Sequence, residues 1–344
     1  MFLLLRCIAL STKADVQITS EAIRFLVEET RVSQGIADLD KDWFSSYIFN
    51  PPTDNENGDN LASQPSSLPP FQISLMALLE TLQIFGVSEP TSTFSNRNQY
   101  FSSSNAFNTP ALGLGGTCRL AYTEIGSPLT ITLSEADINT TCEIMTYEPA
   151  SETDQETIPF ERENLNLKVI MPGFWLSEAM TELSSTNPDV LVLMATSSRM
   201  QVLSLQGLGG AYGDSMVEYR PEGKGNSSSR SPEVTEVFQI NPPDSSGKVK
   251  QRYRFDLIKK AARAMALASK VSVRLDRQGV LSLQFMIQLN EGSSRDHSGS
   301  TNGKAAGRLS FIDFRFVPLL DEQDDGELTD DGDDANSGSE TTSD

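Results

Sequence analysis

The chain has 344 residues, of which 38% are hydrophobic, and it carries a formal net charge of −20. This length allows two hydrophobic cores, because single domains commonly hold about 100–150 residues. The three cysteines, Cys7, Cys118 and Cys142, lack metal-ligand spacing, and their odd number predicts a reduced, intracellular chain. The single histidine, His297, lies in a Ser/Gly-rich stretch, which excludes most histidine-based acid–base, triad and zinc schemes.

The opening residues 2–10, FLLLRCIAL, form an apolar run that is interrupted only by Arg6. No small-residue cleavage site follows the run, so it differs from a secretory signal peptide. It is also far shorter than the roughly 20 apolar residues that span a bilayer. We therefore predict a helix here and no membrane partner.

The first half of the chain predicts strands on either side of a second helix. Strands are expected within 16–29, and FQIS at 71–74 leads into an apolar helix at 75–85. Two strands around a Glu-x-Gly turn follow within 118–133, and a third covers 137–147.

The second half repeats this order with shorter loops. Its predicted elements are a strand at 165–171, a helix at 174–183, strands within 190–206, a strand at 252–255, a helix at 257–268, two strands within 270–285 and a last strand at 309–317. The internal repeat predicts an α+β fold of two similar domains, each with antiparallel sheets and two helices. We expect the halves to lie side by side and to continue each other's sheets.

Polar stretches set the expected domain boundaries. We predict a first domain at 1–146, an interdomain connector at 147–159 and a second domain at 160–320. Low apolar content and turn-forming residues predict loops or insertions at 50–70, 87–116, 221–233 and 291–307.

The last 24 residues, 321–344, contain eleven Asp or Glu residues and no Lys or Arg. Such a segment cannot bury enough apolar surface to fold on its own. We interpret it as a disordered, solubilising tail, with a docking role as the alternative.

One region has a basic character that the rest of the acidic chain lacks. From Lys248 to Arg277 there are ten Lys or Arg residues against two Asp. A helix from Asp256, its expected N-cap, to Ala268 would place an apolar stripe on one face and a basic cluster on the other. The basic residues are Lys259, Lys260 and Arg263 on the helix, and Arg252 and Arg254 on the preceding strand. This pattern favours phosphate contact without base reading, and the alternative is an ordinary solvated face.

Several segments together resemble a known family. They are SLMALLETLQIFG at 74–86, LAYTEIGSPLTITL at 120–133, SKVSVRLDRQGVLSLQFMIQ at 269–288 and FIDFRFVPLL at 311–320 before the acidic tail. The repeated order of elements resembles the sliding DNA clamp fold of proliferating cell nuclear antigen. Within that fold, the segments are similar to the Rad-one-type subunit of the DNA-damage checkpoint clamp, the nine-one-one ring, and the insertions point to a fungal member.

The resemblance implies a ring mechanism in the nucleus. Two other checkpoint-clamp subunits would complete a heterotrimer, which a clamp loader would place around duplex DNA. Arg6, Lys259, Lys260 and Arg263 would then face the phosphates from the helices that line the hole. Subunits would join through edge strands, here 138–146 and 213–219. No cofactor, metal or catalytic residue is implied.

The sequence departs from the family at its start. Clamp domains begin with a strand before the first helix, and the second half has one at 165–171, whereas residue 2 already opens a helix. We expect an in-frame segment with alternating apolar residues upstream of Met1. Without such a strand, the first sheet would expose an unpaired edge.

Two other functions remain open. Some members of the resembled family are credited with 3′→5′ exonuclease activity, which requires carboxylates that converge on metal ions. The Asp-x-Glu pairs, Asp154/Glu156 and Asp325/Glu327, lie on no predicted strand, and the glycine-rich Gly113 and Gly207 stretches lack the lysine of a phosphate loop. A protein-interaction scaffold that never contacts DNA is the other alternative.

Overall fold

The computed structural model describes most of the chain, namely residues 1–51, 67–85, 117–135, 138–149, 157–196, 201–220, 235–242, 247–289 and 308–320. Most of the predicted insertions 50–70 and 87–116, the loops 221–233 and 291–307 and the whole acidic tail lie outside these ranges. The first half contains α1 (Phe2–Cys7), β1 (Lys13–Ile18), β2 (Ala22–Glu29), β3 (Ser33–Asp40), a short 3-10 helix (Lys41–Trp43), β4 (Phe71–Ser74), α2 (Leu75–Ile84), β5 (Thr117–Ala121), β6 (Leu129–Glu135), β7 (Ile138–Ile144) and β8 (Thr146–Tyr147).

The second half repeats this order. It contains β9 (Leu165–Pro172), α3 (Gly173–Ser184), β10 (Val190–Thr196), β11 (Val202–Leu208), β12 (Ser215–Tyr219), β13 (Val237–Ile240), β14 (Lys248–Arg254), α4 (Phe255–Lys259), α5 (Ala262–Leu267), β15 (Lys270–Asp276), β16 (Leu281–Leu289) and β17 (Arg308–Phe316). In strand β15, Val271, Val273 and Leu275 of one face are buried, while Lys270 and Ser272 of the other face are half-buried. Arg274 of that second face is buried as well.

The strand order makes the internal repeat explicit. In the second half, β12, β11, β10 and β14 form a four-stranded antiparallel sheet. In the first half, β3, β2, β1 and β4 are neighbours in the same relative order. Likewise, β15, β16 and β17 are matched by the three-stranded sheet β5, β6 and β7. Strand β3 is therefore the counterpart of β12, and β17 is the counterpart of β7.

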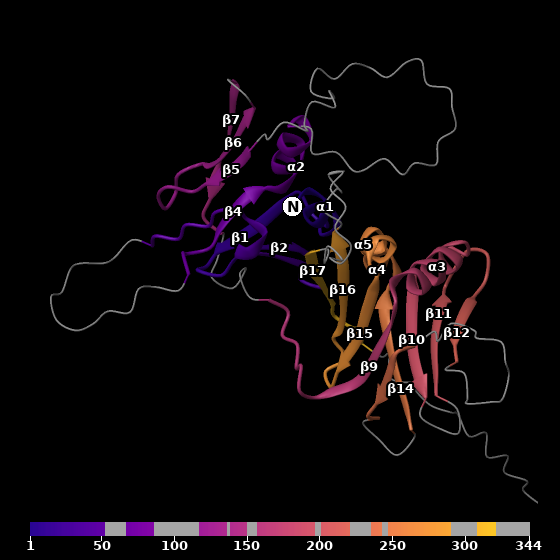
Figure 1. Ribbon diagram of the computed structural model, residues 1–344. Coiled ribbons are helices and arrows are strands. Elements are labelled where there is room, and N and C mark those ends of the chain that lie inside the picture. The colour runs from indigo at the N-terminus through magenta and orange to yellow at the C-terminus, as the bar shows by residue number, and fades with distance from the viewer. Residues whose placement is uncertain are drawn as a thin grey trace, which may run out of the picture.

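One strand pair joins the two halves into a single sheet of ten strands. Strand β17 runs antiparallel to β3, with Phe314 opposite Gly35 and Ile312 opposite Ala37. Phe314 and Ala37 are fully buried at this junction. The halves thus lie side by side and continue each other's sheet, as the sequence predicts (Figure 1).

The helices gather on one side of the molecule. They follow one another in the order α2, α1, α4 and α5, then α3, which stands above β10, β11 and β12 of the four-stranded sheet (Figure 1). Helix α1 packs against α2 and α5, and α5 packs against α3. Gly173, the first residue of α3, permits the approach to α5, because a Cβ atom there would lie 2.5 Å from the Ala268 carbonyl oxygen.

Among the described strands, the first half has no counterpart of β9. In the second half, β9 pairs with β15 and occupies the outer edge of that strand. The counterpart β5 pairs with β6, and no described strand lies along its other edge. Unpaired backbone groups at such an edge are a template for another strand.

Candidate nucleic-acid interface

The predicted basic helix is divided into two short helices. Lys260 and Ala261 donate their backbone N–H groups to carbonyls three residues back, at Leu257 and Ile258. This tighter turn ends α4 at Lys259, and α5 begins at Ala262. The N-cap of α4 is Arg254, so the prediction that Asp256 caps a continuous helix to Ala268 is wrong. Asp256 instead lies in the first turn, where its negative charge suits the helix dipole.

Four of the predicted site residues belong to the helix layer, and we call them the helix-side cluster: Arg6, Lys259, Lys260 and Arg263. Arg6 is exposed at the end of α1, with its guanidinium carbon 5.7 Å from the centre of the Phe2 ring. Lys259 is exposed and Arg263 is half-buried. Because α1 packs against α5, the structure brings Arg6 to the same part of the layer as the second-half residues.

Lys260 differs from Lys259 beside it. Its Nζ donates a hydrogen bond to a carboxylate oxygen of Glu29, the last residue of β2 in the first half. The Glu29 side chain is only 23% exposed. The positive charge of Lys260 is therefore partly neutralised by a carboxylate of the same chain. Lys259 presents its charge more fully to solvent.

The flanks of the helix layer are acidic. Glu80 on α2 and Glu178 and Glu182 on α3 are exposed. Neither α2 nor α3 contains Lys or Arg. Positive charge is thus concentrated where the two halves meet, at α1, α4 and α5, and a polyanion would be attracted to that centre.

The structure separates Arg252 and Arg254 from the helix-side cluster. Val249 and Tyr253 of β14 are buried in the core, and the Tyr253 hydroxyl donates to the Gly279 carbonyl at 2.7 Å. Side chains alternate along a strand, so Arg252 and Arg254 lie on the opposite, outer face of the sheet. Arg254 makes two hydrogen bonds to the Asp256 carboxylate, at 3.2 and 3.0 Å. The six basic residues that were predicted to face DNA together therefore lie on two different surfaces.

The sequence motifs that bear on catalysis fall mostly outside the described residues. Within the described ranges, no group of three or more His, Cys, Asp or Glu side chains could hold a metal ion. Both Asp-x-Glu pairs, His297 and the Gly113 stretch lie outside the described residues. The Gly207 stretch spans the end of β11 and the turn that follows, in which Gly209 has a φ of 75°. That left-handed conformation gives Gly209 a structural role.

A polar cluster under the connector is the feature that sequence reasoning missed. Asp313 accepts hydrogen bonds from Ser282 at 2.6 Å and from Arg315 at 3.3 Å, and its side chain is 11% exposed. Arg315 also donates to the Ile158 carbonyl at 2.6 Å, which fixes the end of the connector. Burial lowers the pKa of Arg274 beside this cluster, and the nearby Asp313 charge partly offsets that effect. The sequence analysis predicted a strand at 309–317 but assigned no role to Asp313 or Arg315.

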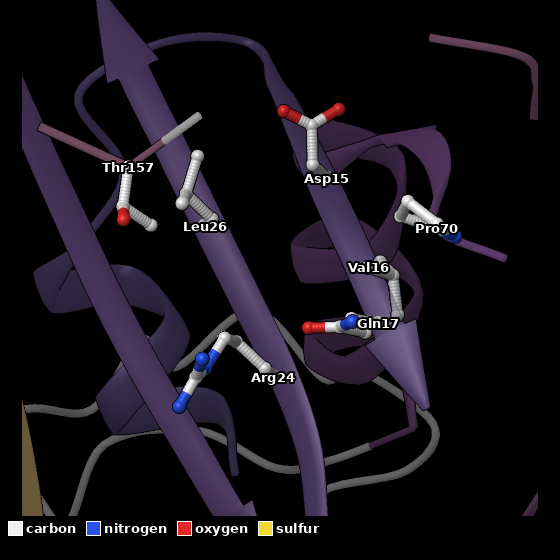
Figure 2. Close-up of a pocket in the computed structure, with 7 residues that line it drawn as sticks. All are labelled: Asp15, Val16, Gln17, Arg24, Leu26, Pro70 and Thr157. Atoms are coloured by element: carbon white, nitrogen blue, oxygen red, sulfur yellow. The ribbon is translucent and has the colours of Figure 1, made fainter. Parts of the chain in front are cut away.

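The outer face of the first half has a shallow pocket of about 100 Å³. Figure 2 shows its lining on β1 and β2, with Asp15, Gln17 and Arg24 presenting polar groups and Thr157 of the connector beside them. Arg24 is held by Asp38, with its Nε 2.7 Å from a carboxylate oxygen. The pocket lies on the sheet, away from the helix-side cluster.

Among the described helices, none is long and apolar enough to cross a bilayer.

Comparison with known proteins places this geometry in a family. Residues 1–287 match the family model described as Rad1: Repair protein Rad1/Rec1/Rad17. The chain is 29% identical over 320 residues to the DNA damage checkpoint control protein rad1 of Schizosaccharomyces pombe, covering 92% of this chain and 82% of that protein. It is 28% identical over 290 residues to the cell cycle checkpoint protein RAD1 of Mus musculus, covering 84% and 83% of the two chains.

Two further similarities bear on fold and activity. The DNA repair exonuclease REC1 of Mycosarcoma maydis is 24% identical over 230 residues, covering 58% of this chain and 47% of that protein. The crystal structure of PCNA from Thermococcus kodakaraensis aligns with a TM-score of 0.55 and 15% identity, covering 92% of this chain and 94% of that one. The chain therefore belongs to the Rad1/Rec1/Rad17 family of DNA-damage checkpoint and repair proteins, and its α+β fold is that of a PCNA-like clamp.

Proposed function

We propose that this chain is a non-catalytic subunit of a heterotrimeric checkpoint clamp that encircles duplex DNA. The observation that carries the proposal is the strand pair β17 and β3, which joins the halves. Their counterparts in the repeat, β7 and β12, each pair with one neighbour and have no second partner among the described strands. One junction of this kind therefore lies within the chain, between β17 and β3. The corresponding strands β7 and β12 stand at the edges of their described sheets.

Such ends suit a ring. The two open strands are different surfaces, so contact between chains is head-to-tail and closes only if the rotation fits. Apolar side chains are exposed on both strands: Ile138 of β7 is 70% exposed and Met216 of β12 is 54% exposed. Pairing of each strand with a partner subunit would cover these residues and the free backbone groups. We assign these edges to two different checkpoint-clamp subunits.

In the ring, the helix-side cluster faces the DNA. Lys259, Arg263 and Arg6 would contact phosphates, and Lys260 would do so less strongly because Glu29 shares its charge. Contacts of this kind are independent of base sequence and weaken with salt, which allows the ring to slide. We further propose action in the nucleus after placement by a clamp loader, with the outer face and its pocket as a platform for signalling and repair factors.

Exonuclease activity is the second candidate function, favoured only by the similarity to REC1. The described residues supply no carboxylate cluster for the metal ions that such chemistry uses. We therefore propose that the chain lacks nuclease activity. Incubation of the purified chain with single- and double-stranded DNA in Mg²⁺ or Mn²⁺ tests this directly, and metal-dependent shortening of 3′ ends would contradict it.

The ring itself is tested by assembly and topology. Co-expression with candidate partner subunits should give a 1:1:1 complex by mass measurement, whereas a stable homotrimer would contradict the assignment. A closed ring loaded on circular DNA should survive a salt wash and should be released when the circle is cut. Equal retention on cut and closed circles would show surface binding without encirclement.

A further inference from the structure

The described chain ends beside β14. The Leu319 backbone N–H donates to the Arg252 carbonyl at 2.7 Å, so the segment after β17 crosses to the edge of β14 that β10 leaves open. The first half makes the same crossing, because β8 follows β7 and pairs antiparallel with β4, with Tyr147 opposite Gln72. Gln72 and Arg252 both lie three residues before their helices, so Leu319 takes the place of Tyr147.

The strand that the chain reaches is basic on its outer face. Lys248, Lys250, Arg252 and Arg254 alternate with core-facing residues, and we call these four the outer basic strip. Lys250 is exposed, while the Arg252 Nε atom is buried without a hydrogen-bond partner. A buried donor of this kind is normally satisfied by an acceptor, and a charged one pairs best with a carboxylate.

The residues that follow Leu320 supply carboxylates. The segment 321–344 has eleven Asp or Glu residues and no Lys or Arg, and its first two residues are Asp321 and Glu322. If it continues the antiparallel direction set at Leu319, Asp321 lies opposite Lys250, on the same face of the sheet. Because the segment is joined to the strip through Leu319, its effective concentration there is high.

We propose that the acidic segment 321–344 binds back along β14 and covers the outer basic strip. Edge strands accept such an added strand through their free backbone groups, and the alternating lysines and arginine give the contact its charge preference. The contact leaves the helix-side cluster as the basic surface open to DNA, because the strip would otherwise attract phosphates to the outer wall.

Lysine footprinting on the full chain tests the contact. In a variant with Asp321→Asn, Glu322→Gln, Asp324→Asn and Asp325→Asn, Lys250 should be acetylated at least about threefold faster, since a tethered contact that is mostly formed shields its site. Lys259 on the helix side is the internal control, and its rate should not change. Equal Lys250 rates in the two proteins would overturn the proposal.

Zero-length cross-linking with a carbodiimide gives an independent readout. In the unaltered chain, carboxylates of 321–327 should join Lys248 or Lys250 in preference to Lys259, and the links should disappear at about 1 M salt, where screening acts within a few ångströms. Links distributed evenly over Lys259 and Lys250 would contradict a specific site.

Charge-reversal variants test whether the acidic segment, and not another molecule, occupies the outer basic strip. In the full chain, Lys248→Glu with Lys250→Glu should speed cleavage of the acidic segment by a Glu-specific protease at least about threefold, because repulsion removes the tethered contact. The matched variant Lys259→Glu with Arg263→Glu should not. Protection of Lys250 only after duplex DNA or a partner subunit is added would assign the strip to that occupant and overturn the proposal.

Discussion

Lys260 and Glu29 form an ion pair that links the two halves of the chain. Lys260 follows α4 in the second half, and Glu29 ends β2 in the first, so 231 positions separate them in sequence. Their side chains are 38% and 23% exposed, and the second Glu29 carboxylate oxygen is buried without a partner. Lys260, which the sequence predicts to contact DNA, thus joins the two halves of the chain.

A double-mutant cycle with Lys260→Gln and Glu29→Gln should measure this pair. We expect a coupling of about 0.5–1 kcal/mol in the free energy of unfolding in urea, because partly exposed pairs are screened by water. The coupling should shrink as salt is raised. A coupling of zero at low salt would mean that the pair does not stabilise the junction.

Replacing Lys259, Lys260 and Arg263 together by Glu should weaken DNA binding of the assembled ring equally for all sequences. The magnitude of the slope of log affinity against log salt should decrease by up to about 3. The decrease should be about 2 if Lys260 pairs with Glu29 and does not contact a phosphate. Assembly with partner subunits should be unchanged. Unaltered affinity and slope would show that this surface is only solvated.

Met216→Asp on β12 should weaken association with the partner subunit at least about tenfold, since it places a charge in a surface that pairing buries. Stability of the isolated chain should change by no more than about 0.5 kcal/mol, because Met216 is 54% exposed. Analytical ultracentrifugation and urea unfolding give the two readouts. The exposed Ile84 of α2 offers a control position, where the same substitution should leave assembly intact.

Arg315→Leu should release the end of the connector. The change removes the hydrogen bond to the Ile158 carbonyl and one partner of the buried Asp313, so we expect a loss of about 2–4 kcal/mol in unfolding free energy. Amide exchange at Ile158 should accelerate as well. Arg24→Leu is the matched control, because its ion pair with Asp38 is about half exposed and should contribute at most about 1 kcal/mol.

The buried tyrosines should limit stability at high pH. Burial raises the pKa of Tyr253 well above its ordinary value, and the nearby Asp276 charge raises it further. The unfolded chain loses this proton near pH 10 while the folded chain keeps it, so stability is full below about pH 10 and falls above it.

Tyr253→Phe tests that assignment. At pH 7 the variant should lose about 1 kcal/mol, because the Gly279 carbonyl loses its partner. Above pH 10 the unfolding free energy of the unaltered chain should fall more steeply, by about 1.4 kcal/mol per pH unit, than that of the variant. Parallel curves in alkaline urea titrations would exclude Tyr253 as the source.

Local pattern was sufficient for much of the fold. Alternation in β15, β16 and β17, and the apolar stripes of the helices, identified the elements and their repetition, because burial on one face imposes a period of 2 or 3.6. The repeat also predicts a strand beside β5, where no described strand lies. The break of the basic helix at Lys260 was not evident from the sequence, because Ala-rich helical periodicity continues through it. Packing decides where the helix is interrupted.

Other features depend on which elements meet in space. Sequence could show that Arg252 and Arg254 share one face of a strand, but only the core position of Tyr253 shows that this face is turned away from the helices. Asp313 and Arg315 are polar residues of a strand, and only the contact with the connector explains why their side chains are buried. The sequence by itself determined the repeated elements and the charge of each segment. The tertiary structure decided which charges act together, because that depends on contacts between segments more than 100 residues apart.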